Sequence, residues 1–186
     1  AYIAQEKVDS DKIHLIDCEN GAMGQSLLVK TAVSLRDAGK SAKEIEDAIR
    51  KLLPQTKTYI VIDTMEYLKR GGRISKSAAL IGGLMKLHPV LQVVADGAKP
   101  VDKVKGKKSC NAWLVNRLLE NPADPDYPIV IGHSNAPERA EKLKEQLEEA
   151  GVKNPVFVTC IGPVVGTHIG PNSLGIGSVS YTHLTL

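Results

Sequence analysis

Short runs of β-branched and aliphatic residues alternate along this chain with longer segments whose apolar residues recur every three or four positions. The first pattern is typical of buried strands, and the second is typical of helices that cover them. Aromatic residues make up only 4% of the sequence, so the core has to be built from Leu, Ile, Val and Ala. Together these features predict layered α/β packing.

The amino-terminal part of the sequence predicts one strand, a loop and two helices. A strand is expected over 12–17, followed by a glycine-bearing turn and a helix through 27–35 that ends at Gly39. Ser41 and Glu44 match a capping box at the start of the second helix. The first part of the chain therefore reads as a strand-loop-helix unit with a further helix attached.

The remaining sequence continues the alternation of strands and helices. A strand over 58–63 leads to a short helix at 65–69 that ends at Gly71 and Gly72. The later expectations are a helix over 77–87, a strand over 90–95, a turn at Asp96 and Gly97 into a return strand, a helix over 109–119, a strand over 127–132, a helix over 137–150, a strand over 155–160 and glycine-rich loops beyond it.

Composition limits the kinds of function open to the chain. The net charge is only +3, from 24 basic and 21 acidic residues, which does not argue for nucleic acid binding. Cys18, Cys110 and Cys160 lie far apart and lack the spacing of a zinc site or a disulfide framework, so reduced cytosolic thiols are expected. No apolar run reaches the length of a membrane span, so no stable membrane insertion is expected.

Standard catalytic and phosphate-binding motifs are missing from the sequence. We find no GxSxG, GxxxxGK[ST], HExxH or CxxC, and the glycines of GAMG and GIGS do not complete GxGxxG. His14, His88 and His133 have no neighbours at metal-ligand spacing, so packing or surface roles are expected and no metal. A protein without chemistry of its own is favoured, and a direct phosphoryl- or acyl-transferase is the alternative.

Two glycine-rich segments stand out as candidate sites. Gly71 and Gly72 precede Arg73, whose guanidinium would lie beside the start of the next helix, where an anion is favoured. Thr167 and His168 lie between glycines near the carboxyl end of the chain. Each segment also has a plain structural interpretation, as a solvated helix corner or a rigid connection, and the residues alone leave both open.

Three longer blocks are more specific than any short motif. They are VIDTMEYLKRGGRISKSAALIGGLMKLHPVLQV, DGAKPVDKVKGKKS and IGPVVGTHIGPNSLGIG. In order and spacing they resemble the signature blocks of the DegV family, and the resemblance runs from about Ile13 to Gly177. The segment HLIDCENGAMGQSLLV is similar to the family's serine-rich loop, although Cys18 stands after Asp17 where family members usually carry Ser.

The resemblance implies a two-domain α/β fold that encloses one fatty acid between its domains. In many bacteria such a protein presents the fatty acid to a separate kinase that makes acyl phosphate, in the cytoplasm and without a cofactor. By resemblance, the end of the first α/β domain is expected at 1–55, a complete second α/β domain at 56–179 and a non-native tail at 180–186. An amino-terminal portion of about one small domain is expected to precede the chain.

The resemblance also assigns candidate residues. Arg73 and His168, with Thr167 as a weaker candidate, match the residues near the acyl carboxylate. The spacing of an aliphatic run allows it to line the acyl tunnel, and a lysine-rich arm matches the surface implicated in docking the kinase. The tunnel candidates are Leu80, Ile81, Leu84 and Met85, and the docking candidates are Lys105, Lys107 and Lys108.

Overall fold

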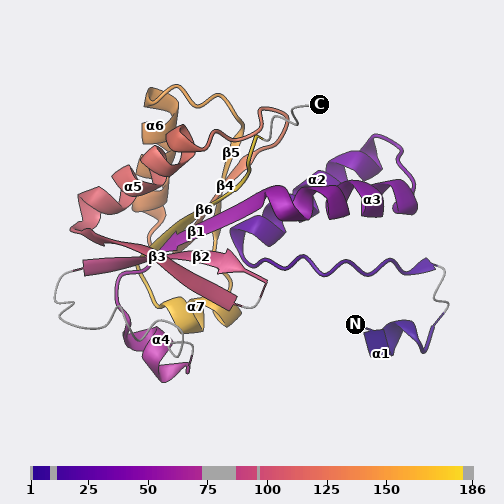
Figure 1. Ribbon diagram of the computed structural model, residues 1–186, viewed down its shortest axis with the longest axis horizontal. Helices are drawn as coiled ribbons and strands as arrows, with labels where there is room; N and C mark the ends of the chain where they lie inside the picture. The colour runs from indigo at the N-terminus through magenta and orange to yellow at the C-terminus, as the bar shows by residue number, and fades with distance from the viewer. Residues whose placement is uncertain (1, 9–11, 73–86, 96, 182–186) are drawn as a thin grey trace.

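A mixed six-stranded sheet forms the centre of the computed structural model, which describes residues 2–8, 12–72, 87–95 and 97–181. The strands follow the order β3-β2-β1-β6-β4-β5, and Figure 1 shows helices on both sides of them. The strands are β1 (Thr56–Val61), β2 (Leu87–Val94), β3 (Gly97–Lys105), β4 (Ile129–Ser134), β5 (Val156–Cys160) and β6 (Ser173–Val179). The helices are α1 (Tyr2–Gln5), α2 (Met23–Asp37), α3 (Ala42–Leu52), the 3₁₀ turn η2 (Leu53–Gln55), α4 (Glu66–Arg70), α5 (Lys107–Glu120), α6 (Pro137–Glu149) and α7 (Pro163–Ile169).

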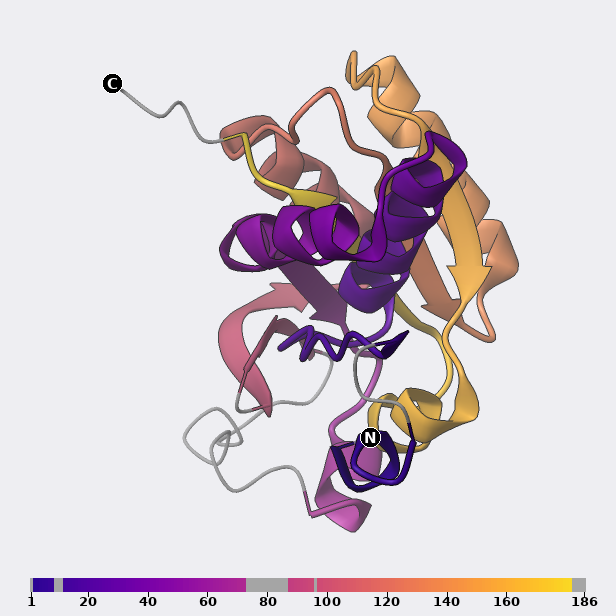
Figure 2. The same ribbon diagram turned by 90° about the vertical axis from the view of Figure 1, so that its right-hand side faces the viewer.

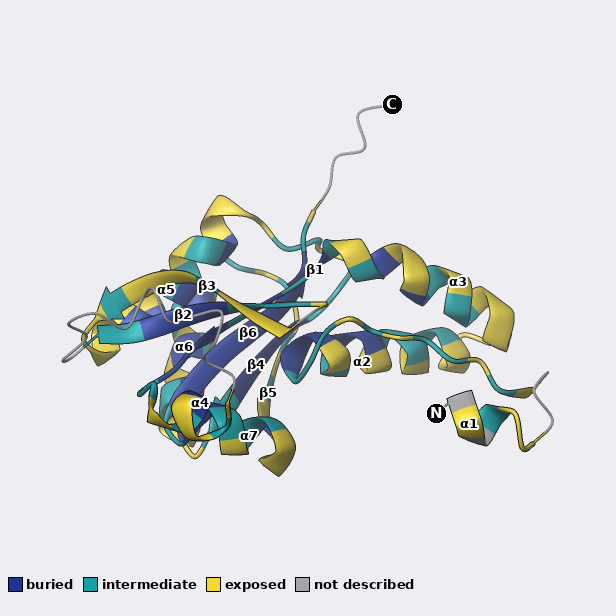
Figure 3. Cartoon of the chain, turned by 60° about the horizontal axis from the view of Figure 1, so that its bottom comes forward, coloured by how far each residue is buried: buried dark blue, intermediate teal, exposed yellow. Residues whose placement is uncertain are grey.

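The sheet separates two hydrophobic cores, because alternate residues of each strand point to opposite faces. On β1, Ile60 packs with α2 and α3, whereas Val61 packs with α5 and α6. All neighbouring strands run antiparallel except β4 and β5, which are parallel. The central strands are buried, while β3 at one edge is largely exposed (Figure 3). The predicted α/β layering is confirmed.

Strand β6 corrects the prediction of glycine-rich loops after residue 160. It lies in the middle of the sheet between β1 and β4, and all of its residues are buried. Gly175 and Gly177 face α2, and a Cβ on Gly177 would lie 2.8 Å from the Cβ of Met23. Glycine is needed here because α2 packs directly on the strand. Glycines at alternate positions therefore mark the face of a strand that receives a helix.

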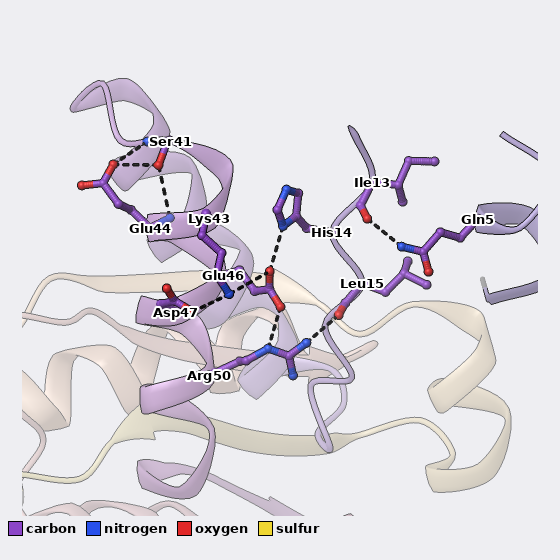
Figure 4. A network of polar contacts seen from close by, with 10 residues as sticks. All are labelled: Gln5, Ile13, His14, Leu15, Ser41, Lys43, Glu44, Glu46, Asp47 and Arg50. Carbon is purple, nitrogen blue, oxygen red and sulfur yellow. Dashed lines mark hydrogen bonds and ion pairs between the residues drawn. The ribbon is translucent and has the colours of Figure 1, made fainter. Parts of the chain in front are cut away.

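The segment 12–17 does not form the predicted strand. Within the described residues it pairs with no other strand, and two of its carbonyls are bonded by side chains instead. Gln5 Nε2 donates to the Ile13 oxygen at 2.7 Å, and Arg50 Nη2 donates to the Leu15 oxygen at 2.9 Å (Figure 4). The apolar pattern produces an extended segment, but a strand also requires a neighbouring strand to bond.

The end of α2 and the start of α3 both have the caps that the sequence predicts. Gly39 has a φ of +80°, and the amide of Lys40 donates to the Leu35 oxygen, as in a Schellman cap. At the start of α3, the side chains of Ser41 and Glu44 each accept a hydrogen bond from the other residue's backbone amide, which confirms the predicted capping box.

Helix α2 packs on the sheet, although it lies before the predicted domain division at residue 55. The division itself stays a prediction. The helix predicted over 77–87 lies almost entirely outside the described residues.

Candidate functional site

An apolar cavity of about 490 Å³ lies on the α2 side of the sheet, within the roughly 300–1,000 Å³ range of small-molecule sites. Strands β1, β2 and β3 form its floor, and α4 and α7 form one wall. Among the described residues that line it, His168 is the one with a polar side chain. The lining residues are Gly21, Ala22, Ile60, Leu68, Gly72, Leu91, Val93, Gly97, Ala98, Val164, Val165, His168 and Ile169.

His168 lies in the last turn of α7 and is half-buried. Its Nδ1 atom is buried and has no hydrogen-bond partner among the described residues. The atom lies against the backbone of Gly71, at the carboxyl end of α4. Helices α4 and α7 are side by side, at the bottom of the molecule in Figure 2. The exposed part of the imidazole is therefore the part that a ligand in the cavity can reach.

The amino terminus of α2 meets the same cavity. Gly21 and Ala22 directly precede the helix and line the cavity, and no side chain caps the first turn. The free amides at a helix amino terminus favour negative charge. Glu19 and Ala22 have φ values of +46° and +47°, which are rare for residues with a side chain. A backbone held in this conformation is found more often at functional sites than elsewhere.

The predicted carboxylate residues are only partly placed. Arg73 lies outside the described residues, and so do the predicted tunnel residues Leu80, Ile81, Leu84 and Met85. The Thr167 hydroxyl donates to the Pro163 oxygen at 2.6 Å, and Thr167 does not belong to the lining of the cavity. Of the predicted set, His168 is thus the residue that the structure places at the cavity.

The lysines predicted to dock a kinase lie together at one edge of the molecule. Lys105 ends β3, and Lys107 and Lys108 begin α5. All three side chains are exposed. They have the accessibility that an electrostatic docking surface needs, and their role stays a prediction.

Sequence reasoning missed the residues that form most of the cavity wall. Leu91 and Val93 are alternate residues of β2, so both face the α2 side of the sheet. Val164 is 79% exposed and Val165 half-buried, in a segment that was expected to be a loop. The alternation of residues along β2 could have predicted that Leu91 and Val93 share one face of the sheet. No signal in the sequence indicated that β2 and α7 line the same cavity, because the two elements lie far apart along the chain.

His14, His88 and Cys110 lie in surroundings that indicate structural roles. His14 Nδ1 lies 2.8 Å from Glu46 Oε2, and His88 Nδ1 lies 3.4 Å from Asp63 Oδ1. Burial raises the pKa of the Cys110 thiol, which disfavours a reactive thiolate. Among the described residues, no group of three or more His, Cys, Asp and Glu could hold a metal ion. No helix in the described part of the chain is long and apolar enough to cross a membrane.

A wider groove of about 740 Å³ lies between α2 and β5. Val29, Val33 and Phe157 line it and are substantially exposed. Its lysine, Lys30, lies 3.6 Å above the centre of the Phe157 ring. No buried polar atom without a partner is found among its described residues, so the cavity at His168 is the stronger candidate.

Curated relatives are similar to this chain over most of its length. A DegV domain-containing protein of Lactococcus lactis is 35% identical over 187 residues, which cover 97% of this chain and 64% of the relative. A second, from Streptococcus pneumoniae, is 31% identical over 154 residues, 82% of this chain and 55% of the relative. The chain thus spans less than two thirds of the length of these relatives.

Solved structures share the fold. A fatty acid binding DegV family protein of Streptococcus agalactiae matches with a TM-score of 0.81 and 27% identity, over 97% of this chain and 64% of that one. The Fatty Acid Kinase B3 protein of S. pneumoniae, solved with linoleic acid, matches with a TM-score of 0.83 and 22% identity, over 96% and 63%. The family model described as "Uncharacterised protein, DegV family" matches residues 1–181. The chain belongs to the DegV family.

Proposed function

We propose that the protein binds a long-chain fatty acid, with the acyl chain in the apolar cavity and the carboxylate at His168. The observation that supports this most directly is a cavity whose described lining consists of aliphatic residues, glycines and His168. Burial of an acyl chain contributes roughly 0.8 kcal/mol per CH₂, so a long chain supplies ample affinity without polar contacts along its length. The S. agalactiae relative, with the same fold, is a fatty acid binding protein.

The carboxylate is the part of the ligand that needs partners. Burying an ionised carboxylate without hydrogen bonds has a free-energy cost of roughly several kcal/mol. The accessible side of the His168 ring and the uncapped start of α2 both lie at the cavity and favour an anion. We assign Arg73 a direct charge-assisted contact with the same group and Thr167 an indirect one, since Thr167 adjoins His168.

The protein is proposed to act as a carrier that presents the acyl group to a separate kinase, in the cytoplasm. None of the described residues that line the cavity has a hydroxyl, thiol or carboxylate that could act as a nucleophile, which favours carriage over direct transfer. The S. pneumoniae neighbour is named as a component of a fatty acid kinase. Lys105, Lys107 and Lys108 would attract an acidic face on the kinase.

Native mass spectrometry of the protein purified from bacteria tests the lipid proposal. The expected spectrum contains an added mass equal to one fatty acid, and stripped protein should take up one added oleate. His168→Leu should weaken oleate binding at least about tenfold, while His168→Gln, which keeps a hydrogen-bond donor, should lose less. Stripped, folded protein that takes up no fatty acid would contradict the proposal.

The kinase proposal has a separate test. Lys105→Glu should lower acyl-phosphate formation by the kinase at low salt, and the difference should shrink as salt rises, because salt screens exposed charges. Oleate binding should stay unchanged. Lys153→Glu, an exposed lysine outside the arm, serves as the matched control. Equal losses from both variants would argue against a docking role for the arm.

A further inference from the structure

Two adjacent glycines at the end of α4 are present for different reasons. Gly72 has a φ of +66°, and nothing lies within 4 Å of the position of a Cβ, so its backbone conformation explains the glycine. Gly71 has φ and ψ of −80° and −1°, a conformation that any residue adopts. The reason for glycine at position 71 must therefore lie in what surrounds it.

The His168 ring occupies the space where a side chain on residue 71 would lie. A Cβ on Gly71 would overlap Nδ1 of His168 and would lie 3.1 Å from its Cε1. It would also lie 3.2 Å from the backbone oxygen of Tyr67, one helical turn earlier. Alanine at position 71 would force the imidazole to move.

The contact between the two helices is reciprocal. Gly71 is the carboxyl-terminal cap of α4 and receives the His168 ring from α7. Gly170 is the carboxyl-terminal cap of α7, and a Cβ there would overlap the Tyr67 ring from α4. Each helix thus ends in a glycine that accommodates an aromatic ring of the other helix. The two glycines therefore allow α4 and α7 to pack closely.

We propose that Gly71 is a positioning residue for His168. Because residue 71 has no side chain, the His168 ring can lie with Nδ1 against the end of α4, and Nε2 is left as the ring nitrogen that meets the ligand. The inference rests on the proposed function for the identity of that ligand, a monocarboxylate. A carboxylate only accepts hydrogen bonds, so the ring nitrogen that meets it must carry a proton. In the neutral ring that nitrogen is Nε2, and Nδ1, which is buried and has no hydrogen-bond partner among the described residues, is left unprotonated.

The test compares Gly71→Ala with Gly162→Ala. Gly162 also caps α7, has a φ of −62°, and has nothing within 4 Å of the position of a Cβ, so alanine fits there without strain. Long-range proton–nitrogen spectra of the histidine rings identify the tautomer, and His168→Ala identifies the His168 signals. We expect the Nε2–H tautomer in the parent protein, shifted His168 signals in Gly71→Ala and unchanged signals in Gly162→Ala. Oleate affinity should fall about tenfold in Gly71→Ala alone.

The outcomes separate this inference from the proposed function. Ring signals of His168 that are the same in Gly71→Ala and the parent protein would overturn the positioning role, whether or not lipid binds. Shifted ring signals in a protein that binds no fatty acid would leave the positioning role intact and refute the proposed ligand. If Gly71→Ala is too unstable to study, Gly71→Ala with His168→Ala should recover the lost stability. A double variant as unstable as the single one would also overturn the inference.

Discussion

Met23 packs against Gly132 so closely that a Cβ on Gly132 would overlap the Met23 sulfur. Met23 is the first residue of α2 and is fully buried, and Gly132 lies in β4. The same side chain covers Gly175 and Gly177 of β6. One methionine thus contacts glycines of two adjacent strands, which places the start of α2, and with it Gly21 and Ala22, at the cavity.

A double-mutant cycle tests this packing. Gly132→Ala should lower the free energy of unfolding by about 1–3 kcal/mol, because the added methyl group meets side-chain atoms of Met23 and Ile161. Met23→Ala alone should cost about 2–5 kcal/mol. The double variant should lose less than the sum of the two, by about 0.5–3 kcal/mol, as measured by urea unfolding.

Gly175→Ala is the matched comparison for that cycle. A Cβ on Gly175 would lie 2.5 Å from the backbone oxygen of Tyr59 as well as overlapping the end of Met23. Truncating Met23 relieves only one of these contacts, so the coupling energy between Gly175→Ala and Met23→Ala should be smaller. Strictly additive losses for Gly132→Ala and Met23→Ala would contradict the proposed contact.

Local signals predicted local structure well. The capping box at Ser41 and Glu44 and the left-handed Gly39 depend on residues within a few positions, and both are present in the structure. The placement of β6 was not predicted, because two of its residues are glycines whose role depends on Met23, far away in the sequence. The strand expected over 12–17 was wrong for the converse reason: its pattern is local, but sheet bonding requires a second strand.

In the candidate site, too, some residues could be predicted from the sequence, and others depend on contacts between distant segments. Family resemblance supplied His168, which the structure places at the cavity, but neither resemblance nor periodicity supplied its surroundings. Gly71 was read as a helix terminator, and its second property, clearance for the His168 ring, appears only when α4 and α7 are brought together. Leu91 and Val93 could have been assigned to one face of a strand, though not to a shared wall with α7.

The network in Figure 4 predicts a pH dependence for the extended segment 12–17. The hydrogen bond with His14, and then that with Arg50, lowers the pKa of Glu46 from the usual 4.5 to about 2. A lowered folded-state pKa contributes stability above pH 4.5, and this contribution is lost as the pH falls toward 2. The amide signals of Ile13 and Leu15 should therefore change as the pH passes through about 2, where the Glu46 carboxylate of the folded protein takes up a proton.

A site-specific measurement is needed here because Glu44 titrates over the same range. Hydrogen bonds from Ser41, and then one from Lys40, lower its pKa to about 2 as well, so global unfolding would not separate the two groups. The Glu46 carboxyl signal, followed by NMR, should titrate near pH 2. In Glu46→Gln the signals of Ile13 and Leu15 should no longer respond as the pH passes through about 2, and a full response there would refute the link.

The capping box gives a prediction for stability. Ser41→Ala removes the oxygen that accepts from the Glu44 amide at 3.3 Å, so the free energy of unfolding should fall by about 0.5–2 kcal/mol. Ser34→Ala, an exposed position within α2, should change it by less than about 0.5 kcal/mol. Thermal unfolding of the two variants at neutral pH compares them directly, and equal effects would show that the cap contributes nothing.

Charge at the wall of the cavity should weaken lipid binding without unfolding the protein. Val164 is 79% exposed and lines the cavity, so Val164→Asp adds a carboxylate beside the ligand while disturbing no buried packing. The new charge would repel the fatty-acid carboxylate and would lose hydration when the acyl chain enters. The dissociation constant for oleate should rise about tenfold or more.

Val29→Asp is the control for that substitution, since Val29 is 56% exposed on α2 and does not line this cavity. Both variants should unfold at nearly the same temperature, and titration with fluorescent or isotope-labelled oleate should separate them. Because the two substitutions add the same charge to exposed valines, a difference in affinity reports position alone. If the two variants bind oleate equally well, the acyl chain does not pass Val164 and the cavity at His168 is not the lipid site.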